Sequence, residues 1–131
     1  MIPCYRQERF LGRTLAALER SLAGRDWLGV LVLAAADGDA PLPERSPHWR
    51  VLRASGDPGT RPLTPGAARN AGFEACGGTW VLFVDADVEV EAAWVERATP
   101  ELRRGGPSLA HGTLLRARPG AAALHRPARG R

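Results

Sequence analysis

The sequence contains no lysine, only two cysteines and no long apolar run. All 18 basic residues are arginine, which together with abundant Ala, Gly and Pro indicates a compositional bias of the source genome. No stretch approaches the roughly 20 apolar residues that a membrane span requires. The N-terminus also lacks a basic region followed by an apolar segment and a cleavage site. We therefore expect a cytoplasmic protein, with the cytoplasmic face of a membrane as the alternative location.

The two cysteines, Cys4 and Cys76, lack the spacing of a metal site or of a redox motif. A chain without an export signal keeps its thiols in a reducing compartment, where disulfides are rare. We predict that both cysteines are free thiols.

The net charge of +4 is unevenly distributed along the chain. Residues 1–100 carry 11 Arg against 13 Asp and Glu, whereas residues 101–131 carry 7 Arg against one Glu. The basic excess therefore lies in a tail rich in Gly, Pro and Ala, and we expect no nucleic-acid partner for the folded part. A polyanion or an acidic membrane surface is the physical candidate for any ligand of the tail.

At 131 residues, the chain has room for one domain with a real core. Apolar patterns and turn signals predict strands and helices in alternation, which favours an α/β fold with a mainly parallel sheet flanked by helices. We expect strands at 2–4, 29–35, 49–53, 80–84 and 108–115, and helices at 8–22, from Thr64 to Gly77-Gly78, and at 91–98. A short turn is expected at Thr99-Pro100. The domain is expected to span residues 1–115, and residues 116–131 to form a disordered tail.

Two carboxylates, Asp85 and Asp87, follow the apolar segment Trp80–Val84 directly. In extended backbone, residues two apart point the same way, so both side chains are expected to face one small volume. Such a pair suits a hard divalent cation and a diphosphate. Trp80 itself, like Trp94, is expected to pack in the core.

Three segments in this order resemble the family-2 nucleotide-sugar glycosyltransferases, which have the GT-A (Rossmann-like) fold. They are Ile2-Pro3-Cys4-Tyr5-Arg6-Gln7-Glu8, Gly66-Ala67-Ala68-Arg69-Asn70-Ala71-Gly72, and Asp85-Ala86-Asp87 at the end of an apolar segment. Arg6 stands where the family usually has Asn. The resemblance covers residues 1 to about 115, and it implies the N-terminal, nucleotide-binding half of the fold.

The resemblance also implies roles for individual residues. Asp85 and Asp87 match the metal and diphosphate ligands, with Mg²⁺ or Mn²⁺ as cofactor. Arg69 matches a position near the nucleotide, with an ion pair on the helix surface as the alternative. Asp37 matches a family acid that contacts the base. The family usually has a second acid directly before it, whereas this chain has Ala36 at that position. Pro3 and Tyr5 belong to the first motif and complete the expected nucleotide-sugar site.

The implied activity is metal-dependent transfer, inverting in stereochemistry, of a sugar from a UDP- or GDP-linked donor to an unknown acceptor. Only 44 residues follow Asp87, so the half that binds the acceptor and supplies a general base is expected to be missing, and no catalytic base is assigned. An open sheet edge would then favour self-association or a partner chain. The alternative is a non-catalytic remnant that binds nucleotide or metal, or that retains only the fold.

Overall fold

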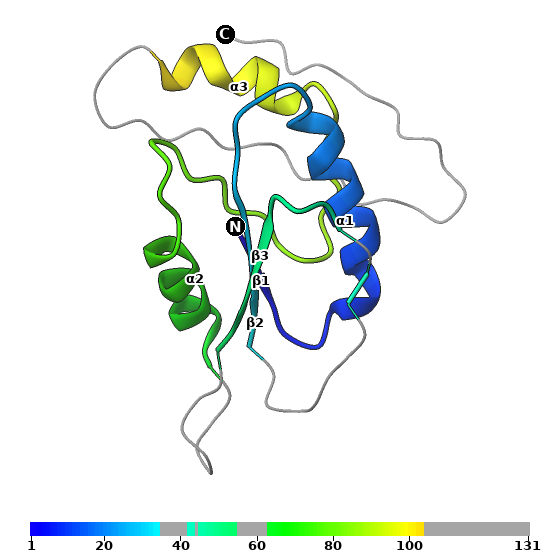
Figure 1. The fold of residues 1–131 in the computed structure, drawn as a ribbon, viewed down its shortest axis with the longest axis vertical. Helices are drawn as coiled ribbons and strands as arrows, with labels where there is room; N and C mark the ends of the chain where they lie inside the picture. The colour runs from blue at the N-terminus through cyan, green and yellow to red at the C-terminus, as the bar shows by residue number, and fades with distance from the viewer. Residues whose placement is uncertain (35–41, 44, 55–62, 104–131) are drawn as a thin grey trace, which may run out of the picture.

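A three-stranded parallel sheet forms the centre of the protein, as seen in the computed structural model, which describes residues 1–34, 42–43, 45–54 and 63–103 (Figure 1). The strands are β1 (Ile2–Cys4), β2 (Gly29–Leu33) and β3 (Trp49–Arg53), in the spatial order β1-β2-β3. Ile2 pairs with Leu31, and Leu31 in turn with Val51. The predicted α/β fold with a parallel sheet is confirmed, and it corresponds to the N-terminal half of a GT-A fold.

Helices cover both faces of the sheet, with α2 (Pro65–Glu74) on one face and α1 (Glu8–Ser21) on the other (Figure 1). The central strand β2 is buried along its whole length because both of its faces are covered. Val30 and Val32 pack on the side of α2, and Leu31 and Leu33 on the side of α1, as the two-residue period of a strand requires. The apolar positions of α1 that were expected to face the sheet, Leu11, Leu15 and Leu18, are buried there.

The N-terminus of α2 has the predicted capping. The Thr64 side chain accepts a hydrogen bond from the Ala67 N–H at 3.2 Å, and Pro65 occupies the first turn, where its missing N–H costs nothing. The helix ends at Glu74, three residues before the glycine pair that was expected to stop it. The glycines therefore belong to the connection after the helix.

The helix after the two aspartates differs from the prediction. It is α3 (Trp94–Leu102), which begins three residues later than expected and continues through Thr99-Pro100, where we predicted a turn. The Thr99 hydroxyl donates to the Val95 carbonyl at 2.6 Å, and the Arg103 N–H donates to the Thr99 carbonyl. Because Pro100 lies near the end of the helix, its missing N–H removes one hydrogen bond without interrupting the helix.

The strand predicted at Trp80–Val84 is absent as a regular strand. Its backbone nevertheless pairs with one residue: the Met1 ammonium donates to the Leu82 carbonyl, and the Val84 N–H donates to the Met1 carbonyl at 3.1 Å. This is the pattern of a parallel pair between Met1 and Phe83, on the edge of β1 that faces away from β2. Because the pairing runs through a single residue, segment 80–84 follows the course of a strand without becoming one.

Trp80 contradicts the expectation of core packing, since 45% of its surface is exposed. Phe83 is also exposed, and its ring stacks on that of Phe73 with centroids 6.3 Å apart. Three large aromatic side chains thus lie on the surface at and beside segment 80–84.

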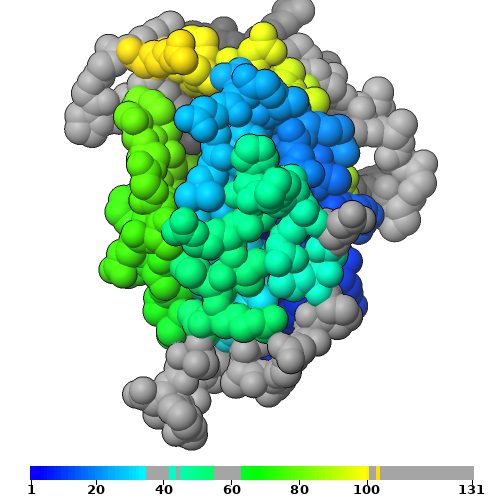
Figure 2. Space-filling view, viewed as in Figure 1, coloured from blue at the N-terminus to red at the C-terminus, as the bar shows by residue number. Residues whose placement is uncertain are grey.

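The space-filling view shows β3 and α2 on one face of the molecule, with α3 across one end (Figure 2). Within the described ranges, no helix is both long enough and apolar enough to cross a bilayer. The strand expected at 108–115, the boundary at residue 115 and the tail 116–131 all lie outside the described residues.

Candidate functional site

The order of the strands creates a reversal point at the carboxyl end of the sheet. The chain passes from β1 to β2 to β3 in one direction, and α2 then returns it to the far side of β1, where segment 82–84 lies. In open α/β sheets, ligands bind outside the carboxyl ends of the strands at such a reversal. The residues at this point are Pro3 to Tyr5, at the end of β1, and Asp85 to Asp87, after segment 82–84.

Pro3 and Asp85 lie at the same level of the sheet. The pairing of Met1 with Phe83 sets the register, and one step of two residues along both segments leads to Pro3 and Asp85. Pro3 is half-buried and Tyr5 is 41% exposed at the end of β1. The structure therefore brings the first and third motifs together at one end of the sheet.

The two aspartates lie on a turn rather than on extended backbone, so the premise of the sequence argument was wrong. The Val88 N–H donates to the Asp85 carbonyl at 3.1 Å, which closes the turn 85–88. Both aspartates are exposed, whereas Ala86 between them is fully buried in the core beside α1. The anchoring of Ala86 leaves both carboxylates on the outer side of the turn.

Arg69 and Asp85 form an ion pair, with Nη2 and Oδ1 2.8 Å apart. The resemblance implied contacts with a donor for both residues, with a surface ion pair as the alternative for Arg69; the structure shows such a pair, across 16 positions of sequence. Both side chains are partly exposed, at 41% and 59%, so the pair adds at most about 1 kcal/mol to stability. Its main effect is to hold one carboxylate oxygen of Asp85 and to offset part of the negative charge of the turn.

The carboxylates of Asp85 and Asp87 would supply oxygen atoms, the donor atoms that Mg²⁺ and Mn²⁺ prefer. In the part of the chain that the structure describes, no group of three or more His, Cys, Asp and Glu side chains could hold a metal. A cation here would take its other ligands from a bound diphosphate and from water, which is how Mg²⁺ is usually held in phosphate sites. The residues present fit a metal that binds together with its substrate.

Asp37 lies outside the described residues, so its place relative to Asp85 stays a prediction. The acids after the turn have other partners: Glu89 forms an ion pair with Arg13 of α1 at 3.5 Å, and Glu91 with Arg97 of α3. Both acids tie the segment that follows the turn to neighbouring helices.

Two residues of α1 and α2 with close long-range contacts were not singled out from the sequence. The Thr14 hydroxyl, buried in α1, donates to the Ala86 carbonyl at 2.8 Å. Gly72 of α2 lies so close to the sheet that an added Cβ would be 2.0 Å from Met1 Cε and 2.9 Å from Val32 Cγ2. Thr14 could have been found from the sequence because it is a polar residue among the apolar positions of α1. Gly72 could have been found because it is the glycine of the ArgAsnAlaGly segment.

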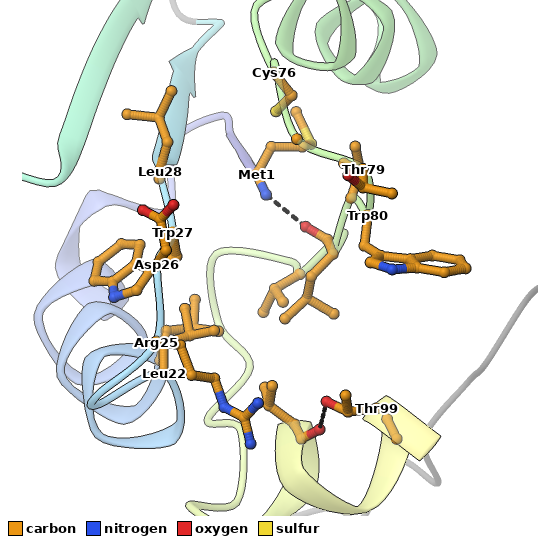
Figure 3. A pocket seen from close by; sticks show the side chains of 18 of the residues that line it. Met1, Leu22, Arg25, Asp26, Trp27, Leu28, Cys76, Thr79, Trp80 and Thr99 are labelled. Atoms are coloured by element: carbon orange, nitrogen blue, oxygen red, sulfur yellow. Dashed lines mark hydrogen bonds between the residues drawn. The ribbon is translucent and has the colours of Figure 1, made fainter. Parts of the chain in front are cut away.

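A separate groove opens at the opposite, amino end of the strands. It is lined by Met1, Gly29 and Trp49, where the strands begin, and by Trp27 and Trp80, which lie on opposite sides of it (Figure 3). Burial lowers the pKa of the Met1 amine at this end of the sheet. Neither Asp85 nor Asp87 lines this groove, and we assign it no part in the candidate site.

The family model described as glycosyl transferase family 2 matches residues 1–129, and the chain belongs to this family. Membership supports glycosyl transfer as the general activity. No curated protein and no solved structure matches the chain.

Proposed function

We propose that this chain binds a nucleoside-diphosphate sugar, UDP- or GDP-linked, together with Mg²⁺ or Mn²⁺, and acts as the donor half of an inverting glycosyltransferase. The observation that carries the proposal is the turn 85–88, which presents two exposed carboxylates at the reversal point of the sheet, with Arg69 beside them. Carboxylates alone would repel a diphosphate, so the pair implies a cation between protein and ligand.

The residues of the chain have distinct parts in this proposal. Asp85 and Asp87 would hold the cation, which stabilises the negative charge that develops on the departing nucleoside diphosphate. Arg69 is always charged, and its planar guanidinium is suited to two-point contacts with phosphate. Asp85 pairs with Nη2 of Arg69, so the other N–H groups of the guanidinium could contact a phosphate at the same time. Pro3 and Tyr5 would form the wall of the site at the end of β1, and Asp37 would contact the base.

The acceptor and its general base are left unassigned. In an inverting transfer, a base removes the proton of the acceptor hydroxyl as that oxygen attacks the anomeric carbon and the nucleoside diphosphate leaves. The acids next to the site, Glu89 and Glu91, are engaged in ion pairs with Arg13 and Arg97. We therefore assign neither of them as the base.

A second candidate function is binding without turnover. It is favoured by the placement of the candidate residues that the structure describes: Pro3 and Tyr5 lie at the end of β1, and Asp85 and Asp87 follow segment 82–84 with Arg69 of α2 beside Asp85. A chain with this site alone could retain nucleotide or metal binding without transferring a sugar.

Calorimetric titration of UDP and GDP, with and without Mn²⁺, tests the donor site. We expect saturable binding that requires Mn²⁺ and is lost in Asp87→Asn. The matched control is Glu89→Gln, which removes the same charge two residues away and should leave binding intact. Binding without metal, or equal binding by Asp87→Asn, would contradict the proposed site.

Release of UDP or GDP from nucleotide sugars separates the two candidate functions. Metal-dependent turnover that is abolished in Asp87→Asn supports the transferase. Tight binding with no release from any UDP- or GDP-sugar, alone or with sugar acceptors, supports the binding remnant.

A further inference from the structure

We propose that Thr14 is a positioning residue for the donor site: its hydroxyl fixes the peptide group between Ala86 and Asp87, and thereby the direction of the Asp87 carboxylate. This inference rests on the proposed function. It concerns a residue 72 positions from its partner, on a helix that contributes none of the expected site residues.

The turn 85–88 is held from both faces of the sheet, but the two aspartates are held differently. The carboxylate of Asp85 is held directly by Arg69 of α2. No hydrogen bond or ion pair of the Asp87 side chain is found among the described residues. The direction of its carboxylate therefore depends on how firmly its backbone is anchored.

Thr14 supplies that anchor. The carbonyl of Ala86 belongs to the peptide group that leads into Asp87, and it accepts the Thr14 hydroxyl hydrogen at 2.8 Å. Thr14 is 1% exposed and Ala86 is fully buried, so water cannot replace this hydrogen bond. The hydroxyl lies farther from the Phe10 carbonyl, at 3.5 Å, which makes Ala86 its principal acceptor.

The neighbouring contacts restrict the turn further. The Ala86 side chain packs in the core cluster with Leu11 and Leu15, on the same helix as Thr14. The Val88 N–H closes the turn by donating to the Asp85 carbonyl. With the Ala86 side chain and carbonyl fixed and the turn closed, Asp87 projects from a rigid support, as a site that must hold a cation requires.

The test uses three variants of the full chain. Thr14→Val keeps the shape of the side chain and removes the hydroxyl, whereas Thr14→Ser keeps the hydroxyl and removes a methyl group. Ser21→Ala is the matched control: it removes another buried hydroxyl of α1, which accepts the Val95 N–H at 3.4 Å far from the turn.

Two quantities are measured for each variant: its affinity for UDP or GDP in the presence of Mn²⁺, and the Mn²⁺ concentration that gives half-saturation. Both are measured under conditions in which circular dichroism shows that the variant is folded. Thr14→Val should weaken Mn²⁺-dependent nucleotide binding by about tenfold to a hundredfold and raise the half-saturating Mn²⁺ concentration. Thr14→Ser should restore both values, and Ser21→Ala should leave them unchanged.

The outcomes separate this inference from the proposed function. If the unmodified protein binds neither UDP nor GDP with Mn²⁺, both fail. If it binds and folded Thr14→Val binds equally well, or if Ser21→Ala loses as much affinity, only the positioning role is overturned. Should Thr14→Val fail to fold, Thr14→Cys offers a weaker donor, and the affinities should then fall from Thr and Ser to Cys. Equal affinities across that series would also overturn the inference.

Discussion

Gly72→Ala should destabilise the protein although alanine favours a helix. In an unstrained helix interior, this change adds about 1 kcal/mol of stability. At Gly72, however, the new Cβ would lie 2.0 Å from Met1 Cε and 2.9 Å from Val32 Cγ2. The Met1 side chain is flexible and can move away. Val32 is branched and fully buried in the central strand, so α2 must shift instead.

The expected magnitude follows from these two opposing effects. Overpacking a well-filled core costs about 1–3 kcal/mol, which exceeds or cancels the gain in helix propensity of about 1 kcal/mol. We expect the free energy of unfolding to fall by up to about 2 kcal/mol on this account. Urea unfolding followed by tryptophan fluorescence gives this value directly.

Two further variants isolate the close contact. Gly66 lies in the same helix with nothing within 4 Å of an added Cβ, so Gly66→Ala should be neutral or stabilising. Val32→Ala removes the atom that the new Cβ meets, and in that background Gly72→Ala should cost less by about 1 kcal/mol or more. If Gly72→Ala matches Gly66→Ala and shows no coupling to Val32→Ala, the packing argument for this glycine is refuted.

Three other predictions follow from single side chains. Arg6 has a φ of 54°, in the left-handed region, so Arg6→Gly should have a free energy of unfolding in urea about 1 kcal/mol higher than Arg6→Ala, which loses the same side chain; equal values would contradict the strain. Burial raises the pKa of Glu19, but hydrogen bonds from the Ser46 N–H and the Trp49 indole outweigh it and lower the pKa below its usual value. The stability that Glu19 contributes is therefore fully present above about pH 5 and is lost as the pH falls through the depressed pKa, so acid titration of unfolding should show a smaller loss in Glu19→Gln. Burial also raises the pKa of the Cys4 thiol to about 11, so a disulfide reagent at pH 8 should modify Cys76 well before Cys4; equal rates would show that Cys4 is accessible.

The fold was predictable where the signal is local. The period of Leu11, Leu15 and Leu18 identifies α1, and the limits of β3 agree with the predicted residues Trp49 to Arg53. The structure of segment 80–84 was not predictable in the same way. A run of apolar residues suggests a strand, but it does not show how many backbone hydrogen bonds the segment will find in a neighbouring strand. The hydrogen bonds that decide its structure belong to Met1, which is 81 residues away from Leu82.

The candidate site was predicted in part. The sequence picked out Asp85 and Asp87 but placed them on extended backbone, and only the structure shows the turn, the pairing of Arg69 with Asp85 and the anchoring of Ala86 by Thr14. Both contacts join residues on different elements, and one sequence contains no information on which polar side chains meet across a sheet. The assignment of Tyr5, Asp37 and the other donor ligands stays a prediction.

The hydrogen bonds of Met1 to segment 82–84 have a kinetic consequence for how the site is assembled. They join the first residue to residues more than 80 positions later, and a loop of that length has a high entropy of closure. Chains dominated by such distant contacts fold slowly compared with chains whose contacts are local. Helices α1 and α2 can therefore form early, whereas the two aspartates reach their places only when the ends of this long loop meet. Recovery of the proposed metal-dependent nucleotide binding during refolding should thus lag behind recovery of helical circular dichroism.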